Sequence, residues 1–146
     1  MAGARNGRTR PDGRGRRMIL VDASVWIANL RGEDTRELRM LRESPDLSEI
    51  GIADLTLFRL LAGAADDRDA DRIGRYLRQF PVLPVTGERS VGRAAGLARS
   101  LRGRGVALQR PEAALIAAHA IDRGHRVLHA DPDMAALAVH CGLQTA

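Results

Sequence analysis

A short apolar segment that ends on an acidic residue constrains the fold of this chain more than any other feature. Residues 18–21 have strand character, Asp22 follows them directly, and Ser24 stands where a helix would be capped. Open α/β sheets usually build their functional sites where a buried strand ends and a helix begins. The segment therefore predicts an α/β fold with a site at Asp22.

Strands and helices alternate along the rest of the sequence. Periodicity and turn residues predict strands near residues 18–21, 49–52, 81–86 and 126–129. They predict helices over residues 24–30, 34–44, 55–63, 66–79, 88–104, 111–124 and 134–142. This order is typical of a short parallel sheet with helices between its strands.

Some residues should have specific places in these helices. Asp54 should cap the third helix, and Pro111 should lie in the first turn of the sixth, where proline is tolerated. On the helix over residues 66–79, four apolar side chains should face the core: Ile73, Tyr76, Leu77 and Phe80. The arginines of that helix should form a solvated row.

The positive charge of the chain is concentrated at its N-terminus. The chain has 146 residues and a net charge of +5, and residues 1–17 contribute six arginines against the single acid Asp12. Residues 18–146 are therefore formally neutral, and we expect them to form one domain. The Gly- and Arg-rich residues 1–17 should be a disordered basic tail, either an RNA-binding arm or a solvated extension.

The remaining composition favours a soluble cytoplasmic protein. Cys141 is the only cysteine, so an internal disulfide is excluded and a reducing compartment is expected. No apolar run approaches the roughly 18 residues that a membrane span requires. The N-terminus also lacks the apolar stretch of a secretory signal.

Two further acids repeat the arrangement seen at Asp22. Asp131 and Asp133 follow the predicted strand over residues 126–129. Parallel strands end at the same edge of a sheet, so these carboxylates can converge with Asp22 and hold Mg2+ or Mn2+. Such an ion could support phosphodiester hydrolysis. The alternative is that the two acids form an ordinary turn that caps the last helix.

Several motifs in order resemble the PIN-domain ribonucleases of the VapC toxin type. The motifs are MILVDASVWI, LLAG, PVLPVT, EAALIAAHA and VLHADPDM, and together they cover residues 18–146. The resemblance implies a PIN-like fold, with a short parallel sheet of four or five strands and helices on both sides. It also implies a Mg2+-dependent endoribonuclease that acts on RNA, forms a homodimer and is neutralised by a small cognate antitoxin.

The resemblance also assigns site residues. Asp22 matches the first family acid, with Ser24 as its supporting hydroxyl residue, and Asp131 matches the fourth, with Asp133 as an additional acid. The second and third acids are replaced by Arg59 and Ala113. These assignments predict a metal site at Asp22, Asp131 and Asp133 that has lost two of its family ligands.

The replacements leave several interpretations open. Glu112 is the acid nearest to the third position. One residue on a helix is a rotation of about 100 degrees, so Glu112 points along a different side of the helix from Ala113. It could reach the pocket only through its longer side chain or if the helix starts at a shifted position. Arg59 could face solvent, pair with Asp22 or Asp131 in place of the metal, or bind an RNA phosphate. The chain is therefore either a weakened VapC-like endoribonuclease or a degenerate PIN protein that binds an antitoxin or RNA without cleaving it.

Overall fold

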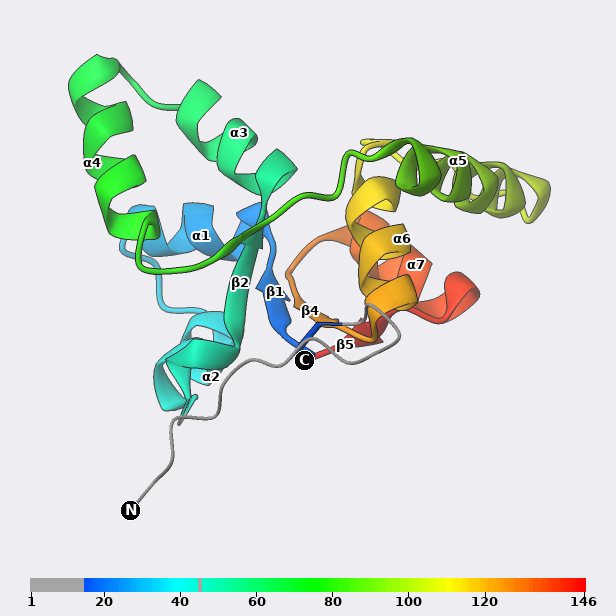
Figure 1. Cartoon of the computed structure of the whole chain (residues 1–146), viewed down its shortest axis with the longest axis horizontal. Helices are drawn as coiled ribbons and strands as arrows, with labels where there is room; N and C mark the ends of the chain where they lie inside the picture. The colour runs from blue at the N-terminus through cyan, green and yellow to red at the C-terminus, as the bar shows by residue number, and fades with distance from the viewer. Residues whose placement is uncertain (1–14, 45) are drawn as a thin grey trace.

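Five parallel strands form the centre of the computed structural model, which describes residues 15–44 and 46–146. The order across the sheet is β3-β2-β1-β4-β5 (Figure 1). Their bounds are Ile19–Val21 for β1, Ile50–Ala53 for β2, Val82–Leu83 for β3, Arg126–Leu128 for β4 and Gln144–Thr145 for β5. The predicted parallel sheet is confirmed. The expected disorder of the N-terminal tail falls mainly on residues 1–14, which lie outside the described residues.

Helices cover both faces of this sheet (Figure 1). The first group is α1 (Ala23–Leu30), α2 (Arg36–Glu43), α3 (Asp54–Ala62) and α4 (Asp67–Leu77), with a short 3-10 helix at Leu47–Glu49. The second group is α5 (Glu88–Gly103), α6 (Ala113–Arg123) and α7 (Pro132–Cys141). None of the described helices is long and apolar enough to cross a membrane.

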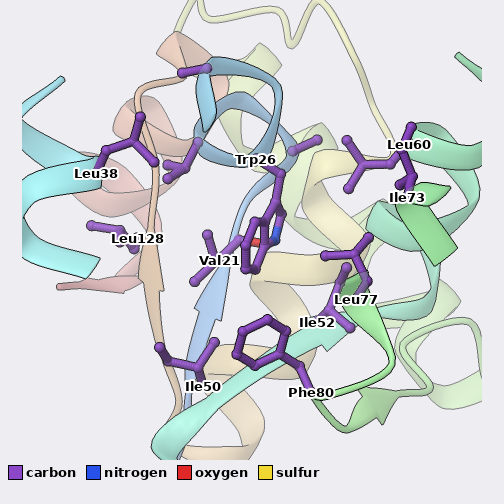
Figure 2. Packing of buried hydrophobic residues seen from close by; sticks show 13 residues of the cluster. Val21, Trp26, Leu38, Ile50, Ile52, Leu60, Ile73, Leu77, Phe80 and Leu128 are labelled. Carbon is purple, nitrogen blue, oxygen red and sulfur yellow. The ribbon is translucent and has the colours of Figure 1, made fainter. Parts of the chain in front are cut away.

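Trp26 organises the core between the sheet and the first group of helices (Figure 2). Its side chain is 1% exposed, and its Nε1 donates a hydrogen bond to the carbonyl oxygen of Val21 at 3.1 Å. The ring also lies 5.3 Å from that of Phe80, measured between centroids. Because the hydrogen bond between Trp26 and Val21 links α1 to the last residue of β1, it fixes the backbone on both sides of Asp22.

Small residues bring α6 close to the other face of the sheet. Ala117 and Ala120 are fully buried against Leu20 and Val127 of the two central strands. Met134 of α7 is fully buried in the same cluster. The packing places the N-terminal ends of α6 and α7 beside the carboxyl ends of β1 and β4, where Asp22 and Asp131 are found.

Three predicted helix starts differ from the structure, and one of them is that of α7, which begins at Pro132 and not at residue 134. The N-cap of α3 is Ala53, and the carboxylate of Asp54 instead accepts hydrogen bonds from Val85 N and Thr86 Oγ1, both at 3.1 Å. Asp54 thus ties α3 to the segment after β3. Pro111 lies in a turn and not in the first turn of the sixth helix, which begins two residues later at Ala113.

Two other details also differ from the sequence-based expectations. Tyr76 is 44% exposed, because it lies at the edge of the aromatic cluster, 6.1 Å from Trp26 between ring centroids. Ile73, Leu77 and Phe80 are buried as predicted. The two-residue strand β5 has too short a pattern to be recognised in the sequence.

Candidate active site

Asp22 lies at the carboxyl end of the central strand and is held there by Ser24. Its side chain is 3% exposed, and its Oδ2 accepts hydrogen bonds from Ser24 N at 3.1 Å and from Ser24 Oγ at 2.7 Å. Ser24 Oγ in turn accepts a hydrogen bond from Ala130 N at 3.1 Å. The serine therefore joins the first acid to the loop that follows β4.

Asp131 is bound by an arginine that the sequence did not single out. It occupies the N-cap position of α7, but its side chain makes no capping hydrogen bond. Instead, Arg110 Nη2 donates to Asp131 Oδ2 at 2.6 Å. The two side chains are 27% and 11% exposed, so this charge-assisted bond is partly shielded from water.

Asp133 fixes the backbone of the loop that contains this arginine. The carboxylate is 6% exposed and accepts hydrogen bonds from Gln109 N at 3.0 Å and from Arg110 N at 2.8 Å, one on each oxygen. Both carboxylates that follow β4 thus contact the loop between α5 and α6. Arg110 is 21 residues from Asp131, and no local pattern in the sequence indicates such a contact.

An open cavity of about 390 Å³ brings the other predicted residues together. It is lined from α1, α3, α6, α7 and the loop before α6, and its lining includes Asp22, Arg59, Arg110, Glu112 and Ala113. Asp131 adjoins this cavity through Arg110. Ser24 and Asp133 are not part of its lining. Ser24 instead binds the carboxylate of Asp22, and Asp133 binds the backbone N–H of Arg110.

Comparison with known proteins now identifies the family. The model of the PIN domain matches residues 19–139. The chain belongs to the PIN-domain family. The resemblance found in the sequence and the expected PIN-like fold are therefore confirmed.

Curated relatives match this PIN domain over nearly their whole length. It is 32% identical over 132 residues to VapC ribonuclease Mb1587 of Mycobacterium bovis, covering 88% of this chain and 98% of the relative. It is 36% identical over 134 residues to ribonuclease VapC32 of Mycobacterium tuberculosis, covering 88% and 97% respectively.

Solved structures agree with this fold. DNA-bound VapBC from Salmonella typhimurium superimposes with a TM-score of 0.70 at 18% identity, covering 90% of this chain and 98% of that one. FitAcB from Neisseria gonorrhoeae gives a TM-score of 0.67 at 20% identity, covering 88% and 96%. At these identities the comparison concerns the fold alone.

Two of the expected acids are absent from the cavity of this PIN domain, as the comparison of its sequence motifs with those of the family indicated. Arg59 is exposed on α3 and makes no ion pair within residues 15–44 and 46–146. The suggestion that Arg59 pairs with Asp131 is wrong, because Arg110 occupies that carboxylate. Ala113 is buried at the start of α6, while the neighbouring Glu112 is exposed and lines the cavity.

In the arrangement described, the acids of this PIN domain are held by other contacts and do not converge as a cluster of three. Ser24 binds one oxygen of Asp22, Arg110 binds one of Asp131, and backbone amides bind both oxygens of Asp133. Within the part of the chain that the structure describes, no group of three or more acidic, histidine or cysteine side chains is placed to share an ion. Mg2+ usually keeps several waters and takes only one or two protein carboxylates, so an ion here would depend on the oxygen of Asp22 and the oxygen of Asp131 that these contacts leave.

Proposed function

We propose that this protein is a VapC-like toxin, an endoribonuclease that acts on RNA. The observation that supports this most directly is the position of Asp22. It lies at the end of the central strand, supported by Ser24 and facing an open cavity. The curated relatives that the chain matches over nearly their whole length are ribonucleases.

The activity we propose is weaker than that of a PIN domain with a complete acid set. Divalent-metal dependence is general among VapC ribonucleases of this family, and we propose Mg2+ or Mn2+ with Asp22 and Asp131 as its principal ligands. Asp133 and Glu112 would support them. Since Arg59 and Ala113 provide no carboxylate and Arg110 neutralises Asp131, the affinity for the ion should be low.

The partners that we propose follow from the same family. Solved relatives include VapBC toxin–antitoxin complexes, and we propose a small cognate antitoxin and a homodimer for this chain. We also propose that residues 18–146 form the PIN domain, that residues 1–17 are a basic extension, and that the protein acts in the cytoplasm, where its RNA substrate is found.

Cleavage of RNA by the purified chain, free of antitoxin, tests the proposed activity. The chain should cleave a structured RNA slowly in 10 to 20 millimolar Mg2+ or Mn2+, a concentration range chosen as roughly saturating for a weak site. Asp22→Asn should reduce the rate by about a hundredfold or more, since it removes the charge that a metal ligand needs. Glu33→Gln, on an exposed turn, is the matched control and should leave the rate unchanged. Equal rates for wild type and Asp22→Asn would contradict the proposal.

A second function is favoured by the contacts of Asp131 and Asp133. An acid paired with arginine and an acid bound to two backbone amides are both already satisfied without a metal. Such a PIN domain could bind RNA or an antitoxin without cleaving RNA. If wild type binds RNA but remains inactive at high Mn2+, this second function replaces the first.

A further inference from the structure

We propose that Arg110 binds a phosphate of single-stranded RNA in the cavity beside Asp22, and that Asp131 and Asp133 position this arginine. The inference rests on the proposed function only in taking RNA as the ligand. It gives the two acids after β4 a role that they have in the absence of a metal ion. It also gives the cavity a cationic ligand-binding residue that lies outside the sequence motifs quoted above.

Two carboxylates hold Arg110 in place without a ligand, one through its backbone and one through its side chain. Its backbone N–H donates to Asp133 Oδ2 at 2.8 Å, and its guanidinium donates to Asp131 Oδ2 at 2.6 Å. Both acids belong to the start of α7, whose next residue, Met134, is fully buried. The arginine is therefore fixed against a rigid element, so less conformational entropy is lost when it binds a ligand.

The contact with Asp131 leaves most of the guanidinium available. A guanidinium has five N–H donors, and among the described contacts the Arg110 side chain uses only Nη2. Its side chain is 27% exposed and lines the cavity. The planar group can therefore present further donors to a phosphate while one edge stays on Asp131.

A second cation and an aromatic ring face the same space. Arg59 lines the cavity from α3, so a bound phosphate would meet arginines from two different elements. Phe58, also in the lining, is 69% exposed. An exposed aromatic ring beside a phosphate site can stack with a nucleobase, which favours single-stranded RNA over free phosphate as the ligand.

RNA binding in the absence of metal tests the role of Arg110. A labelled single-stranded RNA of about ten nucleotides is titrated with the full chain in EDTA, and binding is followed by fluorescence polarisation. Arg110→Ala should weaken binding by about tenfold or more. Arg110→Lys should recover only part of the loss because it keeps the charge but not the planar fork. Arg104→Ala removes an exposed arginine near the start of the same loop and should change affinity less than about twofold.

Two further readouts separate phosphate binding from a structural role. Arg110→Ala should make the dependence of affinity on salt concentration shallower by about one phosphate contact, which a merely unstable variant would not do. Phe58→Ala should weaken RNA binding and leave the binding of inorganic phosphate unchanged. Thermal unfolding checks that each variant is folded, and Arg110→Lys serves if Arg110→Ala is not.

The outcomes distinguish this inference from the proposed nuclease. If Arg110→Ala binds RNA as tightly as Arg104→Ala does, the inference is wrong, even where wild type cleaves RNA in Mn2+. If binding in EDTA depends on Arg110 but no cleavage occurs in Mn2+, the inference stands and the nuclease function is excluded. Tighter Mn2+ binding by Arg110→Ala, with RNA affinity unchanged, would make Arg110 only a counter-ion to Asp131.

Discussion

At the scale of single residues, the site combines one retained family acid with two lost ones. Asp22 keeps its strand-end position and its serine support. Arg59 and Ala113, where the family has acids, both line the cavity, so neither replacement is remote from the site. The side chains at positions 59 and 113, together with the contact between Arg110 and Asp131, therefore determine whether the cavity accepts a cation.

Restoring both acids should therefore strengthen the proposed cation site. Arg59→Glu combined with Ala113→Asp should raise affinity for Mn2+ by about tenfold or more. A cation about 5 Å from a divalent ion, at an effective dielectric near 20, is repelled by up to about 7 kcal/mol, and solvent screening of the exposed Arg59 reduces this. Titration calorimetry with Mn2+ measures the change.

The control for this double variant makes the same exchanges elsewhere. Arg78→Glu and Ala95→Asp alter two exposed positions, the C-cap of α4 and the surface of α5, and should leave Mn2+ binding as in wild type. If the restored pair binds Mn2+ no better than this control, Arg59 and Ala113 are not the positions of the missing ligands.

At the scale of elements, a buried histidine links the amino ends of the two central strands, β1 and β4. Met18 N donates to His125 Nδ1 at 2.9 Å, which joins the start of β1 to the start of β4. Burial, reinforced by the neighbouring His119 and Arg123, lowers the pKa of His125 to about 4. Burial also lowers the pKa of His119. The packed sheet thus requires a neutral His125.

Acid should therefore weaken the fold in a defined range. Between pH 6.5 and about 4 the unfolded chain binds the His125 proton and the folded chain does not, so the free energy of unfolding falls as the pH falls. The loss should reach about 2 to 3 kcal/mol at the acid end. Urea unfolding at several pH values measures this slope.

His125→Asn isolates this contribution. Asparagine offers Met18 N an acceptor but cannot be protonated in this range, so the slope should become shallower. A slope equal to wild type in His125→Asn would show that other groups cause the acid sensitivity.

The elements were largely predictable, but the contacts between them were not. The strand ending at Asp22 and the acids at 131 and 133 are local patterns, because strand character and turn residues lie next to each other in the sequence. Arg110 had no such pattern, because its role depends on a carboxylate 21 residues away. Similarly, Asp54 resembles a helix cap in sequence, and only the fold brings Val85 to it.

At the scale of the whole molecule, positive charge gathers at the end of the sheet opposite the candidate active site. A cavity of about 470 Å³ there is lined by Arg17, Arg89, Arg93 and Arg123, together with Asp122, which Arg93 contacts at 2.6 Å. The arginine-rich residues 1–14 precede this region in the sequence.

Deleting residues 1–17 should lower the affinity for RNA. Six arginines and one acid are removed, so the dependence of affinity on salt concentration should also become shallower. Electrophoretic mobility shifts at 50 and 200 millimolar salt, about the range in which counterion release is easily resolved, measure both effects. A variant with Arg5, Arg8, Arg10 and Arg14 changed to glutamine separates charge from length. Unchanged affinity and slope in both variants would leave the segment without a role in binding RNA.

The way in which Asp133 binds its loop has a consequence for how this site can evolve. The carboxylate contacts the backbone of residues 109 and 110 and no side chain there, so it holds the loop whatever amino acid follows Gln109, proline excepted. Replacing Arg110 by lysine, glutamine or glutamate would preserve both of these bonds. The charge that faces Asp131 is therefore set by a single codon, and selection can change it without rebuilding the loop.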